Sequence, residues 1–74
     1  EYGLGAAGRV RLEIYNVLGQ PVRVLVDEES QDAGMYQVEW DARDQRGATV
    51  AAGVYLTRLV YPGGVETRRL LYLK

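Results

Sequence analysis

The fold is decided by the run Val10-Arg11-Leu12-Glu13-Ile14-Tyr15, in which apolar and polar residues alternate. A period of two is typical of a half-buried β-strand, whereas an amphipathic helix repeats every three to four residues. Val10, Leu12 and Ile14 therefore share one face of a predicted strand. The three polar or amphipathic side chains between and after them share the opposite face.

Similar patterns recur along the rest of the chain and are separated by turn-forming residues. Gly19 and Pro21 indicate a turn after the first run, because glycine accepts positive φ and proline fixes its own φ. Pro62-Gly63-Gly64 indicates a second turn near the end. The predicted strands, six or seven in all, are a weak one at 2–4, then 10–15, 22–26 and 36–40, a brief edge strand around 49–51, and 54–61 and 65–73.

This spacing predicts an all-β, immunoglobulin-like β-sandwich of antiparallel strands. The segment 41–46 lacks an apolar stripe and is followed by Gly47, which argues against a helix there. We expect Trp40, with Tyr36 and Val38, to form the centre of the core, because a large aromatic side chain contributes much of the burial in a small domain. The acidic segment 27–34 has no apolar period and is interpreted as a solvent-exposed loop.

Length and composition limit the possible functions. The 74 residues predict one domain spanning 1–74, without room for a deep active-site cleft. The formal net charge of −1 argues against a nucleic-acid partner, because proteins that bind nucleic acids carry a clustered basic face. We also expect no transmembrane segment and no N-terminal export leader, since no apolar run approaches the ~20 residues that span a bilayer.

The residue types present do not assemble a catalytic site. The chain has no cysteine and no histidine, so the usual pairs of nucleophile and base are unavailable. Ser30 is the only serine and lies in the acidic segment. General acid catalysis by a carboxylate needs burial to raise its pKa, and the polar segments give no sign of it. We therefore predict no catalytic residues and no cofactor.

Three binding alternatives stay open at this point. One is a Ca²⁺ site, for which Asp41 and Asp44 offer oxygen ligands and Gly47 a flexible residue. The spacing does not match an EF-hand, and Arg43 and Arg46 would repel a cation, so a turn in which the two carboxylates bond nearby backbone N–H groups is favoured. The tyrosines offer a carbohydrate-stacking platform, although half-buried tyrosines are ordinary in sandwiches. Arg58 and its cationic neighbours near the end suit an acidic partner, or they serve only solubility on an edge hairpin.

Three blocks of the sequence together resemble a known family. They are Val10 to Arg23 (VRLEIYNVLGQPVR), Gly34 to Asp41 (GMYQVEWD) and Ala52 to Leu59 (AGVYLTRL). In this order and spacing they resemble the C-terminal sorting domains (type A) of proteins exported by the type IX secretion system, and the related immunoglobulin-like domain of flagellar hook-capping proteins. The closing block, TRRLLYLK, is similar to the last strand of the sorting domains. The loop at 43–47 looks more like the hook-capping relatives, and the sorting domains carry a proline- and asparagine-rich first strand that this sequence lacks before Tyr2.

The resemblance implies a non-catalytic domain that directs an attached cargo protein across the outer membrane to the cell surface or the medium. The implied partners are outer-membrane secretion proteins and a covalently linked upstream cargo domain. An exposed terminal strand can pair with a receptor by strand addition. The residues expected to bind the partner are Thr67, Arg68, Arg69, Leu71, Leu73 and Lys74. The alternatives are a structural immunoglobulin-like interaction module and a carbohydrate-binding module.

Overall fold

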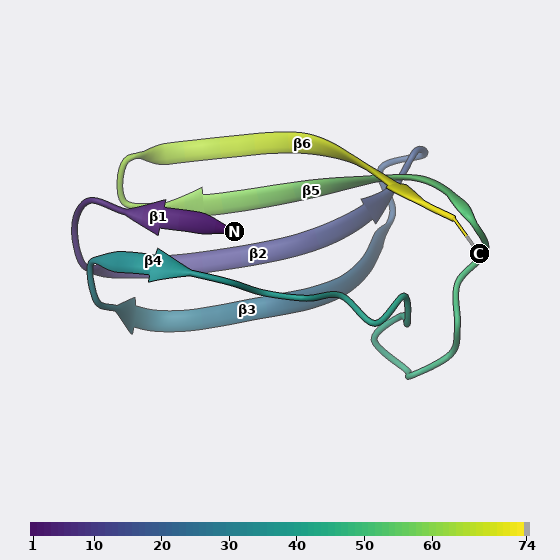
Figure 1. The fold of residues 1–74 in the computed structure, drawn as a ribbon, viewed down its shortest axis with the longest axis horizontal. Coiled ribbons are helices and arrows are strands. Elements are labelled where there is room, and N and C mark those ends of the chain that lie inside the picture. Colours follow the sequence, from purple (N-terminus) through teal and green to yellow (C-terminus); the bar gives the residue numbers. More distant parts are fainter. Residues whose placement is uncertain (74) are drawn as a thin grey trace.

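The chain folds into strands joined by turns and one long connection. A computed structural model describes residues 1–73 and contains six strands (Figure 1). Their bounds are β1 Tyr2–Leu4, β2 Gly8–Asn16, β3 Pro21–Gln31, β4 Gly34–Tyr36, β5 Gly53–Tyr61 and β6 Gly64–Tyr72. Within residues 1–73 there is no helix, and hence none long and apolar enough to cross a membrane. The predicted all-β class is confirmed.

The strands form two antiparallel sheets that face each other. The larger sheet has the order β3-β2-β5-β6, and the smaller sheet pairs β1 with β4. Figure 1 shows the small sheet lying across one face of the large one. We call this covered side the inner face of the large sheet and the other side its outer face. The two layers and six strands agree with the predicted sandwich.

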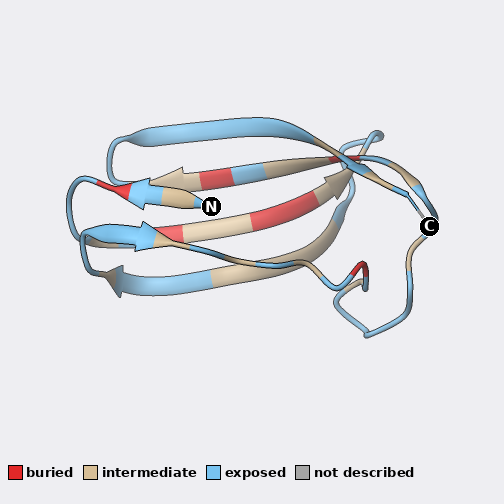
Figure 2. Cartoon of the chain, viewed as in Figure 1, coloured by how far each residue is buried: buried red, intermediate tan, exposed pale blue. Residues whose placement is uncertain are grey.

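The core lies between the two sheets, where the alternation in β2 predicted it. Val10 and Ile14 on the inner face of β2 are 0% and 1% exposed. Leu4 from β1 and Leu59 from β5 pack around Val10. Figure 2 shows the buried positions concentrated along β2, with shorter stretches on β1 and β5. The fold therefore depends on a small apolar cluster centred on β2, where burial supplies most of the stabilisation.

The expectation that Trp40 forms the centre of the core is wrong. Strand β4 ends at Tyr36, so Val38 and Trp40 lie in the irregular segment that follows it and are only half-buried. The indole of Trp40 packs edge-on against Tyr55 at 5.1 Å between ring centroids. Its N–H donates to the carbonyl of Arg43 at 2.9 Å. Trp40 thus closes one end of the sandwich, with its polar N–H satisfied locally.

The acidic segment also differs from the expectation of a solvent loop. Strand β3 continues to Gln31 and pairs with β2 as far as Gly8. Arg9 on β2 bonds Asp27 at 2.7 Å and Glu29 at 3.0 Å across the pair. The cross-strand charges compensate for the poor strand propensity of acidic residues, because opposite charges on facing positions stabilise a sheet.

The connection between β4 and β5 contains tight turns in place of the predicted edge strand at 49–51. Only an isolated bridge joins Arg43 and Thr49. Ala42 is buried and adopts a φ of 60°, which is costly for a residue with a Cβ. Gly47 takes a φ of 87°, where glycine carries no such penalty. The predicted turns at 16–21 and 62–64 are present as expected.

Candidate interaction surface

The residues predicted to bind a partner lie along β6, the last strand of the large sheet. Thr67, Arg68, Arg69 and Leu71 are within β6, and Leu73 follows it. Lys74 falls outside the described residues. Strand β6 pairs with β5 along one side only, because it stands at the end of the sheet order. The structure therefore places five of the six predicted residues on or beside one sheet edge.

The pleat of β6 divides these residues between the two faces of the sheet. Successive side chains in a strand point to opposite faces. Arg68 lines a groove of about 260 Å³ on the inner face. Arg69 and Leu71 therefore lie on the outer face. The two arginines, which are adjacent in sequence, therefore flank the edge from opposite faces, as the alternation in the predicted strand 65–73 requires.

The outer face of β6 carries apolar side chains in contact with solvent. Val65 is 52% exposed and Leu71 is 61% exposed. Leu73, beyond the strand, is 71% exposed. Leu71 stands opposite Val54 of β5, which is 37% exposed. Single exposed apolar residues are ordinary, whereas a row of exposed apolar side chains along an unpaired sheet edge favours pairing with another chain.

The backbone of β6 presents a row of hydrogen-bonding groups to solvent. The two-residue turn at Pro62 and Gly63 makes Tyr61 and Gly64 a hydrogen-bonded pair, and such pairs then alternate along an antiparallel ladder. The even-numbered residues of β6 consequently bond to β5. The outward N–H and C=O groups belong to Val65, Thr67, Arg69 and Leu71.

The ladder between β5 and β6 is regular over its whole length. Its nine pairs, from Gly53 with Tyr72 to Tyr61 with Gly64, show no shift in register. A bulge would twist the edge away from an incoming strand. Strand β6 therefore offers a straight edge onto which another strand can add.

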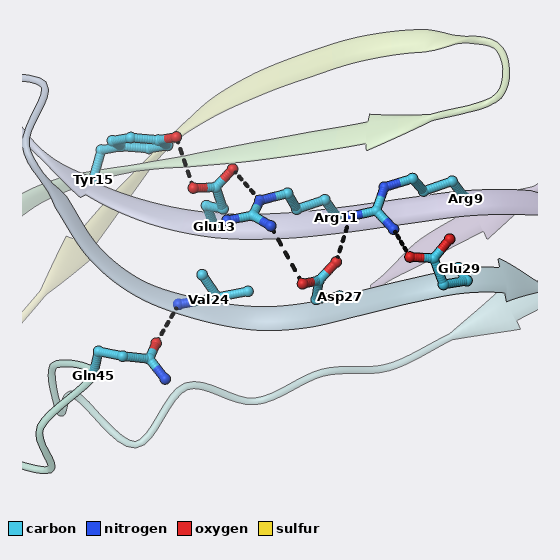
Figure 3. A network of polar contacts seen from close by, with 8 residues as sticks. All are labelled: Arg9, Arg11, Glu13, Tyr15, Val24, Asp27, Glu29 and Gln45. Atoms are coloured by element: carbon cyan, nitrogen blue, oxygen red, sulfur yellow. Dashed lines mark hydrogen bonds and ion pairs between the residues drawn. The ribbon is translucent and has the colours of Figure 1, made fainter.

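The opposite edge of the large sheet, formed by β3, is partly closed. Gln45 from the long connection lies against it (Figure 3). The N–H of Val24 donates to the side-chain oxygen of Gln45 at 2.9 Å, and the N–H of Gln45 donates to the carbonyl of Val22 at 2.9 Å. Three register shifts also interrupt the pairing of β2 with β3. These features protect the β3 edge in the ways that natural sheets use.

A polar network covers the outer face of the large sheet and was not predicted from the sequence. Figure 3 shows a chain of contacts along β2 toward β3. The carboxylate of Glu13 accepts bonds from Arg11 and Tyr15, both at 2.8 Å. Arg11 also bonds Asp27 at 3.3 Å, and Asp27 bonds Arg9. The only sequence signal was that these residues alternate with the core positions of β2.

Glu13 is the buried member of this network, with 8% exposure. Burial raises the pKa of a carboxyl group, but hydrogen bonds from Arg11 and Tyr15 and the positive charges of Arg11 and Arg58 outweigh it, so the pKa of Glu13 is lowered. The hydrogen bond to Glu13 correspondingly raises the pKa of Arg11. A carboxylate held ionised in this way is a structural anchor, because a general acid requires a raised pKa.

The carboxylates considered for calcium form turns within the chain. Asp44 Oδ1 accepts bonds from the N–H groups of Arg46 and Ala48 at 2.9 and 3.0 Å. Asp41 Oδ1 bonds the guanidinium of Arg23 at 2.6 Å. Among residues 1–73 no group of three acidic, histidine or cysteine side chains is arranged to hold a metal ion. The turn interpretation of these residues is the one that the geometry supports.

The aromatic side chains contact one another at two places. Tyr2 stacks on Tyr36 at 5.3 Å between ring centroids. Tyr55 and Tyr72 pack at angles against Trp40. Because Trp40 meets its neighbours edge-on or tilted, these three rings do not form a flat exposed platform of the kind that stacks on a sugar.

Comparison with known proteins places the chain in a family. Residues 2–64 match the family described as the FlgD Ig-like domain. No curated protein and no solved structure gave a match. The matched region contains β1 to β5 and ends as β6 begins, so most of the β6 edge lies outside it. The predicted relationship to the hook-capping immunoglobulin-like domain is confirmed: the chain belongs to the FlgD Ig-like domain family.

Proposed function

We propose that this chain is a non-catalytic, structural immunoglobulin-like module that binds another protein chain through the open edge of β6. The observation that carries the proposal is the contrast between the two edges of the large sheet. Strand β6 is regular, and its edge facing away from β5 is unpaired. Gln45 and the register shifts, in contrast, close part of the β3 edge. Unprotected edges invite strand addition, and proteins use that mode to bind extended segments of other proteins.

The side chains of β6 support this role. Backbone groups of an added strand bond to the outward groups of Thr67 and Arg69, and the exposed Val65 and Leu71 contact its side chains. Arg68 and Arg69 provide positive charge on opposite faces and orient the partner electrostatically. The binding energy thus comes from the backbone, and the selectivity comes from the flanking side chains.

Photocrosslinking in the native organism tests this proposal. A photoreactive amino acid at Val65 is expected to crosslink to a bound protein, and the same group at Val24, where Gln45 covers the β3 edge, is expected not to do so. Thr67→Pro tests whether the crosslink depends on strand addition. It removes an outward N–H that an added strand would bond, and it leaves the ladder to β5 intact. Equal crosslinking from both edges, or crosslinking that survives Thr67→Pro in a folded chain, contradicts the proposal.

A type IX sorting signal is the second candidate function. The blocks that resemble sorting domains favour it, and so does the cationic last strand, which lies largely beyond the residues matched by the family. In this role β6 binds outer-membrane secretion proteins, the attached cargo is secreted or placed on the cell surface, and Leu71 and Leu73 become buried against the receptor.

A reporter fusion separates the two candidates. The chain is fused to a fluorescent protein with an export leader, in a bacterium that has the type IX system. Reporter at the cell surface that is lost with Thr67→Pro supports the sorting signal. Folded reporter retained in the periplasm leaves the structural module as the function.

A further inference from the structure

The charge pattern of β6 identifies a specific partner strand, and this inference rests on the function proposed above. Glu66 and Arg68 both lie on the inner face, because they are two residues apart in the strand. Their side chains form a weak ion pair at 3.5 Å and are 48% and 74% exposed. Thr67 lies between them with its backbone groups directed away from β5.

We propose that β6 binds β6 of a second copy of this chain, antiparallel, about a two-fold axis at Thr67. The two large sheets then form one continuous sheet of eight strands. Closed two-fold contacts of this isologous kind are the commonest in soluble oligomers.

Backbone geometry restricts the possible registers. Only residues with outward groups can form the hydrogen-bonded pairs of the new ladder, so odd-numbered residues must face odd-numbered residues. Within the central segment 66–69, two-fold axes at four positions satisfy this condition. They differ in which charged side chains they bring opposite each other.

Three of these registers place like charges together. An axis at Glu66 puts two carboxylates opposite each other. Axes at Arg68 and at Arg69 put two guanidinium groups opposite each other, and like charges directly opposite are destabilising. The axis at Thr67 instead places Glu66 opposite Arg68 of the second copy, twice by symmetry.

These facing positions suit ion pairs. With Thr67 opposite Thr67 as a hydrogen-bonded pair, the neighbouring positions are non-hydrogen-bonded pairs, in which side chains approach most closely. Each copy contributes one Glu66 and one Arg68, and the four charges alternate in sign along the contact. The contact area of one strand edge is small, so the dimer is expected to be transient.

Sedimentation of the purified chain tests this inference, over concentrations from about 10 µM to about 1 mM. The wild-type chain is expected to sediment increasingly as a dimer. Arg68→Glu brings carboxylates together and is expected to weaken the dimer at least about tenfold. The double variant Glu66→Arg with Arg68→Glu exchanges the charges and is expected to restore the affinity to within about threefold.

Two controls make the outcome specific. Arg46→Glu changes the net charge by the same amount in a distant turn and is expected to leave the dimer unchanged. Thr67→Pro removes an outward N–H at the axis and is expected to abolish the dimer, with near-ultraviolet circular dichroism of Trp40 reporting that each variant is folded.

Each result has a definite meaning. A dimer that disappears with Arg68→Glu and returns with the double variant supports the Thr67 register. A chain that stays monomeric, or a dimer unaffected by these substitutions, overturns it. If the chain is monomeric while photocrosslinks from β6 still reach a different protein, the proposed function stands and only the identity of the partner is wrong. If those crosslinks are also absent, both proposals fail.

Discussion

The side-chain oxygen of Gln45 accepts the backbone N–H of Val24 at 2.9 Å, and this bond closes part of the β3 edge. The position of Gln45 explains why the two edges of the large sheet differ. A residue remote in sequence supplies to β3 the kind of partner that a neighbouring strand would supply. Strand β6 has no equivalent among the described residues, so the sheet has one partly closed edge and one open edge.

Gln45→Ala is expected to remove this protection at a modest cost. The free energy of unfolding should fall by about 1 kcal/mol, the net value of one hydrogen bond, because the bond from Gln45 N–H to Val22 remains. Urea denaturation measures the change. Hydrogen exchange should show the amide of Val24 becoming less protected, and an unchanged Val24 exchange rate would be inconsistent with the closed edge.

Ile14 is almost fully buried in the core, so stability should be sensitive to truncation of its side chain. Ile14→Ala is expected to lower the free energy of unfolding by about 2–5 kcal/mol, because it removes buried methyl and methylene groups and leaves a cavity. The matched control, Leu18→Ala, alters a side chain that is 79% exposed and should change stability by less than about 0.5 kcal/mol. Thermal and urea unfolding measure both, and similar effects at the two sites would place the core elsewhere.

Glu13 should make stability depend on acid pH. Its pKa is lower in the folded chain than in the unfolded chain. The ionised network therefore stabilises the fold fully above the unfolded pKa of a glutamate, and this stabilisation is lost as pH falls through the lowered folded pKa. Glu13→Gln is expected to flatten this part of the stability profile. Urea denaturation between about pH 2.5 and about pH 7 measures the free energy of unfolding of both chains. If this free energy depended on pH with the same slope in both, Glu13 would not titrate in this way.

Asp44 should stabilise the long connection without a metal. Asp44→Ala is expected to lower the free energy of unfolding by about 1 kcal/mol, because two backbone N–H groups lose their acceptor. Calcium is expected to leave the midpoint of thermal unfolding unchanged in the wild-type chain, since Asp44 and Asp41 are engaged within the chain. A calcium-dependent rise in that midpoint would revive the metal-site alternative.

The alternation of apolar and polar residues predicts the strands in which it is uninterrupted. The expectations for the acidic segment and for Trp40 are wrong because contacts between residues distant in the sequence decide the structure there. Val10 and Ile14 point inward as the alternation in β2 requires. The local pattern does not predict the strand through Asp27, because its stabilising partner, Arg9, lies 18 residues away in the sequence. The local pattern places Trp40 at the core centre, because nothing in the neighbouring sequence shows that β4 ends at Tyr36.

The position of the candidate surface depends on long-range contacts in the same way. The residues of β6 can be identified from sequence, but the open edge depends on strand order and on the contact between Gln45 and Val24. The opposite facing of Arg68 and Arg69 follows from the pleat once the strand bounds are fixed. The buried position of Glu13 depends on neighbours from three strands and has no local signal.

Amide hydrogen exchange of β6, measured by NMR on a dilute sample of the chain, shows whether this edge is open. We expect alternation: the amides of Glu66, Arg68 and Leu70, which bond to β5, exchange slowly, whereas those of Thr67 and Arg69 exchange rapidly. Uniform protection along β6 would overturn the open edge, because it would mean that this edge is already covered and is not available to a partner.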